Sequence, residues 1–207
     1  RFLSPLATQW QGQVDGMDDW SVADVTPQRQ FYSRWVEPYA RSGKKICVII
    51  SDAFRYEAAD EMMSRINREN KYQASLEHLL SALPSYTQLG MASLLPSNEG
   101  EFSISETDSS VFIGGISTQG TVNRDKVIKT ALGDSACAQQ AKTILAMTQM
   151  EGRELFKNHD VIYIYHNRID HVGDKMQSEG EAFDATERTF DDLITLVKKL
   201  TTYNASN

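Results

Sequence analysis

The chain has 207 residues, enough for one α/β domain with a sizeable core or for most of a larger one. Its hydrophobic fraction of 41% and charged fraction of 24% are ordinary for a soluble globular protein. The formal net charge of −7 argues against a broad nucleic-acid or anionic-membrane surface, although it is compatible with a local basic channel. The two cysteines are too few for a disulfide framework, so we expect a reducing, cytoplasmic setting. No apolar segment approaches the length needed to span a membrane.

The first 43 residues are predicted to be a helical extension or the tail of a preceding domain. Thr26 and Pro27 are typical of a helix start, with Thr as the N-cap and Pro at the first helical position. Three aromatic residues continue the helix at four-residue spacing: Phe31, Trp35 and Tyr39. Ser42-Gly43 ends this pattern, and the first residue of the chain is Arg rather than Met, so we expect a fragment of a longer protein.

An unbroken apolar run from Ile46 to Ile50 opens the expected main domain, at residues 44–207. Five consecutive apolar residues, rich in β-branched types, predict a strand that is buried on both faces. The run ends at Asp52, and the apolar residues that follow take helical spacing. Ligands of open α/β sheets bind at the carboxyl ends of the strands, so Asp52 is the first candidate functional residue.

Two hydroxyl residues, Ser85 and Thr87, form the second candidate group. They follow an expected strand at about 72–80 and precede a short apolar helix that we predict from Leu89 to Leu95. A hydroxyl at a helix N-terminus lies beside unpaired backbone N–H groups and the positive end of the helix dipole, which suits a phosphate group.

The rest of the chain alternates expected strands and helices. We predict an inserted hairpin at about 97–120, helices at about 123–132, 138–147 and 149–158, a buried strand at 160–165 and a long helix at about 179–203. The buried strand ends in a loop with four candidate residues: His166, Asp170, His171 and Asp174. We expect the strands at 45–51 and 160–166 to be parallel neighbours that bring Asp52, Asp170 and Thr87 into one crevice.

These residue types are compatible with metal-assisted phosphoryl transfer. Carboxylates and a histidine in one crevice suit divalent ions such as zinc or manganese, and two ions about 3.5–4 Å apart stabilise both oxygens of an in-line displacement. Taken singly, each group has a structural interpretation as well. Asp52 can be a helix cap, Ser85 or Thr87 a turn residue, and Asp170 and Asp174 solvated loop acids.

Three stretches of the sequence resemble the alkaline phosphatase superfamily, and in particular its PglZ family, which is associated with the BREX phage-exclusion systems of bacteria. They are Val48-Ile-Ile-Ser-Asp-Ala-Phe-Arg-Tyr-Glu57, Leu83-Pro-Ser-Tyr-Thr-Gln-Leu-Gly-Met-Ala92 and Tyr163-Ile-Tyr-His-Asn-Arg-Ile-Asp-His-Val-Gly-Asp174. The resemblance anchors most of residues 44–203. It implies a three-layer α/β fold, a sheet flanked by helices, with the small β-hairpin as an insertion.

The resemblance also implies roles for four residues. Asp52 corresponds to a metal ligand, and Thr87 corresponds to the metal-bound nucleophile, with Ser85 as the weaker candidate. Asp170 corresponds to an acidic ligand of the second metal, while Asp174 stands where the phosphodiesterase branch has a histidine. An all-oxygen loop favours manganese or magnesium over zinc. His166 and His171 could restore an imidazole, but their positions do not match the motif.

The metal site of the superfamily needs a further Asp-His pair and a final histidine, and no matching motif follows in this sequence. We therefore expect the amino-terminal part of a catalytic domain, inactive by itself, with the two divalent ions absent or weakly bound. An unpaired sheet edge should favour self-association.

The leading hypothesis is a metal-dependent phosphohydrolase or phosphodiesterase domain of a cytoplasmic phage-defence protein. Its partners would be other BREX proteins and a phosphate ester or nucleic-acid substrate, with no membrane. The alternative is a non-catalytic scaffold in a multi-protein defence complex. A haloacid-dehalogenase-type phosphatase with Asp52 as nucleophile is disfavoured, because that chemistry needs a second acid where Phe54 stands.

Overall fold

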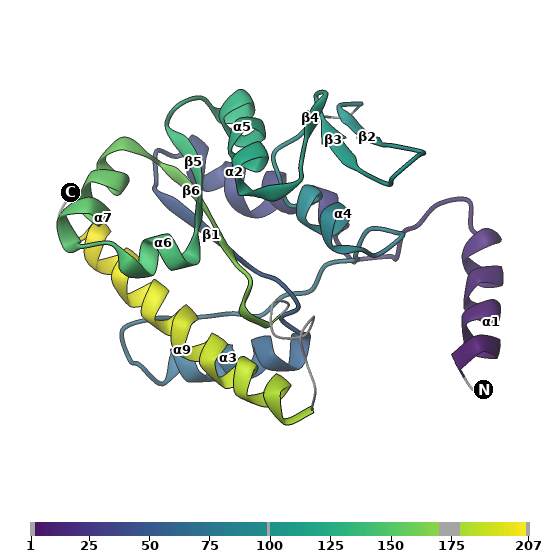
Figure 1. Ribbon diagram of the computed structural model, residues 1–207, viewed down its shortest axis with the longest axis horizontal. Coiled ribbons are helices and arrows are strands. Elements are labelled where there is room, and N and C mark those ends of the chain that lie inside the picture. Colours follow the sequence, from purple (N-terminus) through teal and green to yellow (C-terminus); the bar gives the residue numbers. More distant parts are fainter. Residues whose placement is uncertain (1–2, 99, 170–178, 206–207) are drawn as a thin grey trace.

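A parallel sheet lies at the centre of the computed structural model, which describes residues 3–98, 100–169 and 179–205 (Figure 1). Its strands are β1 (Ile46–Ser51), β6 (Val161–His166) and β5 (Ala136–Gln140), in the order β1-β6-β5. The strands predicted at 45–51 and 160–166 are thus adjacent and parallel, with Ile46 paired to Val161 and Ser51 to His166. All six residues of β6 are buried, because this central strand is covered on both faces.

Helices cover both faces of the sheet, which makes three layers (Figure 1). One layer holds α2 (Glu37–Arg41), α4 (Thr87–Ala92) and α5 (Gly120–Leu132), and we call this side the α5 face. The other layer holds α3 (Tyr56–Asn67), α6 (Ala141–Ala146), α7 (Gln149–Asn158) and α9 (Glu179–Asn204), and we call this side the α9 face. Successive strand residues point to opposite faces, so Tyr163 and Tyr165 pack on the α5 face and Ile162 and Ile164 on the α9 face.

The N-terminal region is helical, as expected. The helix α1 (Leu3–Asp15) has no buried residue and lies apart from the sheet in Figure 1. A 3-10 turn (Gln28–Gln30), a π-helical turn (Tyr32–Val36) and α2 follow, and the helix ends before Ser42-Gly43 as predicted. The prediction of Thr26 as N-cap is wrong: Pro27 holds the cap position, and the Thr26 hydroxyl instead accepts a hydrogen bond from Arg34.

The predicted strand at 72–80 is also wrong. This segment is extended and alternates half-buried and exposed residues, but its only ladder contact is an isolated bridge between Pro27 and Leu80. Two hydrogen bonds between Asn67 and the Ala74 backbone, of 2.7 and 3.1 Å, help to hold the segment in place. The alternating pattern therefore reflects packing on the domain surface rather than pairing with a neighbouring strand.

The predicted helix at 138–147 begins too early. Residues 136–140 form β5, and the helix α6 occupies only Ala141–Ala146. Alanine and glutamine favour helices, but pairing with β6 along the whole of β5 overrides that preference. The other long helices agree with the prediction: α5 begins at Gly120, α7 spans Gln149–Asn158, and α9 spans Glu179–Asn204.

The predicted hairpin at 97–120 is present and has a third strand. β2 (Phe102–Ile104), β3 (Val111–Ile113) and β4 (Ile116–Ser117) form a small antiparallel sheet that packs on the α5 face. Gly114 and Gly115 connect β3 to β4 with φ angles of 56° and 77°, as a two-residue hairpin turn requires. None of the helices that the structure describes combines the length and apolarity needed to span a bilayer.

Candidate functional site

The carboxyl ends of β1 and β6 meet at one edge of the sheet, where the sequence predicted a site. Ser51 is paired with His166, and the next backbone N–H, that of Asp52, donates a hydrogen bond of 2.9 Å to the His166 carbonyl oxygen. Asp52 therefore follows β1 directly, beside the end of β6. This edge is the one at which open α/β sheets bind their ligands.

An arginine of α5 lies at this edge on the α5 face. The Arg124 guanidinium is 4.7 Å from the centre of the Tyr165 ring, and its Nε donates a hydrogen bond of 2.8 Å to the Thr118 carbonyl oxygen. Burial lowers the pKa of Arg124, whereas the nearby Tyr165 and Asp52 groups oppose this shift. An arginine stays charged even so, and the edge thus holds a cation close to Asp52.

The Tyr165 hydroxyl is the unusual group of this arrangement. The side chain is 7% exposed, and its hydroxyl makes no hydrogen bond of good geometry with the described residues, although the Arg124 guanidinium lies close enough to interact with it. Burial raises the pKa of Tyr165 well above its usual range, against the opposing effect of Arg124. Two residues earlier on the same face, the Tyr163 hydroxyl donates a hydrogen bond of 3.1 Å to the Leu94 carbonyl oxygen. Buried hydroxyls without a partner are rare, and each one needs an explanation.

The predicted nucleophile, Thr87, is the exposed first residue of α4. The helix α4 is connected to Arg124 through Thr118, whose hydroxyl accepts a hydrogen bond of 3.4 Å from Gln88 Nε2 and whose carbonyl oxygen accepts the bond from Arg124. Ser85 is exposed in the turn before the helix. The start of α4 and Arg124 therefore belong to the same face of the sheet.

The α9 face of the same edge carries a row of hydrogen-bonded polar groups. Ser51 Oγ lies 3.0 Å from His166 Nδ1, and His166 Nε2 lies 3.1 Å from Asp192 Oδ2. Arg168 Nε donates to the same Asp192 oxygen at 2.6 Å. Burial favours the neutral form of Asp192, but the hydrogen bonds from Arg168 and His166 outweigh it and lower the pKa of Asp192.

Of the polar residues at this edge, His166 was a candidate from the sequence, whereas Ser51, Arg124, Arg168 and Asp192 were not predicted. Asp192 did leave a signal, because it falls within the buried stripe of α9 between Thr189 and Leu196, where an acid needs a partner. Arg124 left none, since its role depends on contacts with residues far away in the sequence.

The remaining predicted ligands, Asp170 and Asp174, and the open candidate His171 lie outside the described residues. Within residues 3–98, 100–169 and 179–205, no group of three or more His, Cys, Asp or Glu side chains is placed to hold a metal ion. The described donors alone, with Asp52 as the carboxylate at the edge, therefore do not make up a divalent-metal site.

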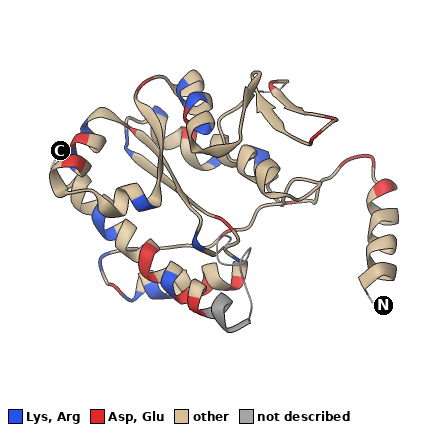
Figure 2. Ribbon diagram, in the orientation of Figure 1, with Lys and Arg blue, Asp and Glu red and all other residues tan. Residues whose placement is uncertain are grey.

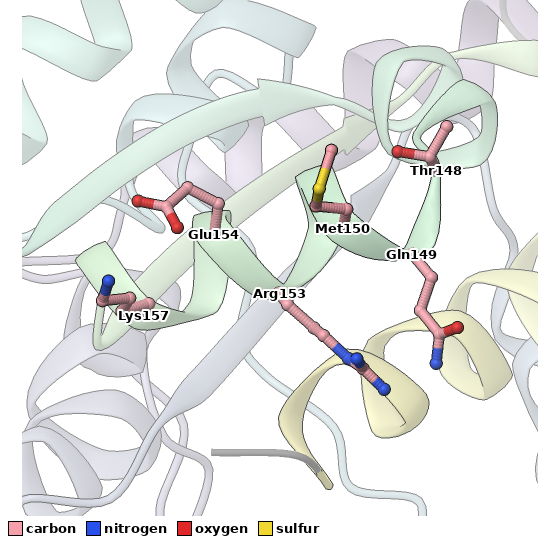
Figure 3. Close-up of a pocket in the computed structure, with 6 residues that line it drawn as sticks. All are labelled: Thr148, Gln149, Met150, Arg153, Glu154 and Lys157. Atoms are coloured by element: carbon pink, nitrogen blue, oxygen red, sulfur yellow. The ribbon is translucent and has the colours of Figure 1, made fainter.

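A separate surface hollow lies over α7 (Figure 3). Its six lining residues come from this one helix and its cap: Thr148, Gln149, Met150, Arg153, Glu154 and Lys157. All six are exposed, and α7 leads into the amino end of β6 rather than its carboxyl end. The hollow therefore belongs to the opposite side of the fold from the candidate site.

The fold and this edge define an open α/β domain with an acidic residue at the ligand-binding end of its first strand. A family model described as "BREX system PglZ alkaline phosphatase-like domain" matches residues 31–207. The chain belongs to this PglZ family of alkaline phosphatase-like domains, as its sequence motifs indicated.

Two relatives support the assignment. The alkaline phosphatase-like protein BrxZ of Escherichia coli O9:H4 (strain HS) is 37% identical over 204 residues, which cover 96% of this chain and 23% of the relative. The alkaline phosphatase-like protein PglZ of Bacillus cereus (strain H3081.97) is 36% identical over 209 residues, which cover 100% of this chain and 24% of the relative. The chain thus spans about a quarter of the length of both relatives.

Proposed function

We propose that the chain supplies part of the active site of a metal-dependent phosphohydrolase or phosphodiesterase. The observation that carries this proposal is the position of Arg124, which brings a positive charge to the strand edge at Asp52. The planar fork of an arginine matches the oxygens of a phosphate group, and a cation aimed at them stabilises the charge of the transition state. Membership of the PglZ family agrees with this chemistry.

Thr87 is the proposed nucleophile. Its hydroxyl oxygen attacks phosphorus in line with the leaving oxygen. A Thr–O–P bond forms as the ester P–O bond breaks, and the leaving oxygen takes up a proton in place of the one that the Thr87 hydroxyl loses and departs as an alcohol. A water molecule then attacks the same phosphorus, the Thr–O–P bond breaks, the Thr87 oxygen regains a proton, and the phosphate or the remaining phosphomonoester leaves. Arg124 contacts a non-bridging oxygen during both displacements.

Divalent ions complete the proposal. Asp52, Thr87, Asp170 and Asp174 are the proposed ligands of two ions, zinc or manganese, together with donors from elsewhere in the whole protein. When bound, such ions neutralise phosphate charge and lower the pKa of a hydroxyl nucleophile. The substrate class is a phosphate ester, which includes nucleic acid, and the whole protein acts in the cytoplasm with other BREX proteins. An unpaired edge of the sheet could also pair two copies.

The test is an assay of an aryl phosphodiester with added manganese or zinc. It compares the 207-residue chain, the whole protein that carries it, and the Thr87→Ala and Ser85→Ala forms of the whole protein. We expect turnover by the whole protein and by Ser85→Ala, and none by Thr87→Ala or by the chain alone.

Three results would contradict parts of the proposal. Turnover that survives Thr87→Ala would remove Thr87 as the nucleophile. Turnover by the chain alone, lost on Thr87→Ala, would show that the chain already holds enough metal ligands. No turnover by the whole protein with either metal would favour a scaffold role in a defence complex.

A further inference from the structure

The helix α1 carries an apolar stripe that faces solvent. Four apolar side chains share one side of this helix, at spacings of three and four residues, and we call them the α1 stripe: Leu3, Leu6, Trp10 and Val14. Leu3 is 76% exposed, Leu6 50% and Trp10 54%. Of the ten large apolar residues that are exposed in the described part of the chain, five lie within residues 3–22. Apolar surface concentrated in this way marks an interaction site.

The stripe is attached to the body of the domain at one end. The Trp10 ring lies edge-on to the Trp20 ring, with the ring centres 6.0 Å apart. The Trp20 indole N–H donates a hydrogen bond of 2.7 Å to the Ser81 carbonyl oxygen, and the segment after Ser81 leads into α4. Figure 1 shows the rest of α1 apart from the sheet. The stripe therefore presents Leu3 and Leu6 to a surface outside the described fold.

The composition of α1 indicates the kind of partner. Asp15 is the one charged residue of the helix, and its other polar side chains are those of Ser, Thr and Gln. A helix that lies on a membrane carries Lys and Arg on its polar side, and a nucleic-acid surface also needs basic residues. An apolar stripe on an almost uncharged helix instead fits an apolar protein surface.

The small size of the stripe favours a partner within the same polypeptide. Stable complexes of separate proteins bury about 800 Å² on each partner. From their exposed fractions, the four side chains of the stripe offer only on the order of 400 Å². Two surfaces on one polypeptide meet at an effective concentration in the mM range, so a small apolar contact is sufficient there.

The relatives supply polypeptide of the required length. The Bacillus cereus relative matches the whole of this chain, α1 included, whereas the family model begins at residue 31. The matched regions are 23% and 24% of the two relatives, so about three quarters of each relative lies outside them. We propose that the α1 stripe packs against a part of the whole protein that lies outside these 207 residues. This inference is independent of the proposed function.

The first experiment asks whether the stripe is covered in the whole protein. Hydrogen exchange of the α1 amides is measured by mass spectrometry in the wild type, Leu6→Glu and Thr8→Glu. Leu6→Glu places a charge in the stripe, and Thr8→Glu places the same charge at an exposed position on the opposite side of the helix. Leucine and glutamate have similar helix propensities, so a change in Leu6→Glu reports lost packing.

A 13-residue helix without packing is marginally stable in water. We therefore expect the α1 amides to exchange about 10-fold faster or more in Leu6→Glu than in the wild type, and at the wild-type rate in Thr8→Glu. Equally fast exchange in the wild type and Leu6→Glu would overturn the proposal, because the stripe would then be free in the whole protein.

The second experiment identifies what covers the stripe. Whole protein with Leu3→p-benzoylphenylalanine, which keeps the position apolar, is irradiated as a mixture of unlabelled and heavy-nitrogen-labelled molecules. We expect cross-links from position 3 to residues outside the 207-residue chain, with the same label on both peptides. Cross-links that combine the two labels would make the occupant a second copy. Any result without a same-label cross-link to residues outside the chain overturns the proposal.

Discussion

The two faces of the sheet differ most at the carboxyl edge. On the α9 face, Ser51, His166, Arg168 and Asp192 satisfy one another's hydrogen bonds. Farther along the same face, Arg65 of α3 pairs with Glu61 and with Glu187 of α9. Figure 2 shows the result as red and blue segments intermixed on α3 and α9. The α5 face instead leaves the buried Tyr165 hydroxyl without a partner in the described residues and keeps the Arg124 cation partly buried.

This difference indicates on which face of the sheet a ligand-binding site would lie. A satisfied polar network adds rigidity, whereas buried polar groups without partners cost free energy and are retained at places where a ligand completes them. The α5 face also holds α4 with the proposed nucleophile Thr87. The proposed function therefore places the substrate on the α5 face, opposite the closed polar network of the α9 face.

The strongest test of this assignment is Asp52→Asn in the whole protein. Asparagine keeps an oxygen that can accept the Ala53 N–H, which Asp52 Oδ1 now accepts at 3.0 Å, but it loses the negative charge. We expect kcat/KM to fall by about 10³-fold or more with little change in Tm, or a rise, because acids held for function rarely favour folding. The control is Asp60→Asn, at an exposed position of α3. A variant that is inactive because it is unfolded would make Asp52 a structural cap.

Thiol reactivity tests whether the α9 face is closed. Cys47 and Cys137 both pack in its core, and burial raises the pKa of Cys47 to about 12 and that of Cys137 to about 11. A raised pKa keeps a thiol protonated, and only the thiolate reacts. At pH 8 an ordinary cysteine with a pKa of about 8.5 is about one quarter ionised, so Ellman's reagent should modify the two thiols of the folded chain about 10²- to 10³-fold more slowly than those of the urea-unfolded chain, with Cys137 the faster.

The rate of that reaction should rise about tenfold for each pH unit above 8, for as long as the protein stays folded. Rapid modification of the folded chain at pH 8 would show that the α9 face opens to solvent. The α9 face would then be no more closed than the α5 face.

Substitution of Arg124 tests the α5 face directly. Arg124→Ala should lower kcat/KM for an aryl phosphodiester by about 10²-fold, because a cation aimed at the phosphate oxygens is lost. Arg124→Lys should recover only part of this loss, since lysine keeps the charge but has neither the planar fork nor the stack on Tyr165. Lys126→Ala, at an exposed position of the same helix, is the control. Equal activity of Arg124→Ala and the wild type would remove Arg124 from the site.

The sequence predicted the centre of this fold because its two main strands, β1 and β6, are continuous apolar runs; β6 is buried on both faces, whereas β1 is buried on the α5 face and half-buried on the α9 face. A continuous apolar run of this kind has few structural interpretations other than a buried strand. The end of the first run therefore places Asp52 at the carboxyl edge of the sheet without any knowledge of the tertiary structure. The strand β5 was missed because its residues favour a helix, and only pairing with β6 makes it extended. The prediction at 72–80 failed for the opposite reason: the segment has a strand pattern, but no strand among the described residues pairs with it.

The site was predictable only where its residues lie in the matched motifs. Asp52 is at the expected edge, and Thr87 opens α4 on the face where Arg124 lies. Metal binding by Asp52, Asp170 and Asp174 stays a prediction. Arg124 makes its contacts with residues far away in the sequence and was not recognisable locally, whereas Asp192 left one signal, its place in the buried stripe of α9.

The smallest expected effect is a difference in stability between substitutions of two tyrosines, Tyr163 and Tyr165, on the same face of β6. Tyr163→Phe removes a hydroxyl that donates to the Leu94 carbonyl oxygen at 3.1 Å, and it should destabilise the chain by about 1 kcal/mol. Tyr165→Phe removes a buried hydroxyl that has no hydrogen-bond partner in the described residues, so the free energy of unfolding should stay constant or rise by up to about 1 kcal/mol.

Thermal unfolding of both variants checks this comparison, with expected Tm shifts of about 2–4 °C in opposite directions, or a shift for Tyr163→Phe only. Because the two substitutions remove the same atom from the same strand, changes in helix or strand propensity cancel between them. A loss of stability in Tyr165→Phe equal to that in Tyr163→Phe would mean that the Tyr165 hydroxyl is satisfied after all. The α5 face would then be as closed as the α9 face, and the difference on which we base the position of the site would disappear.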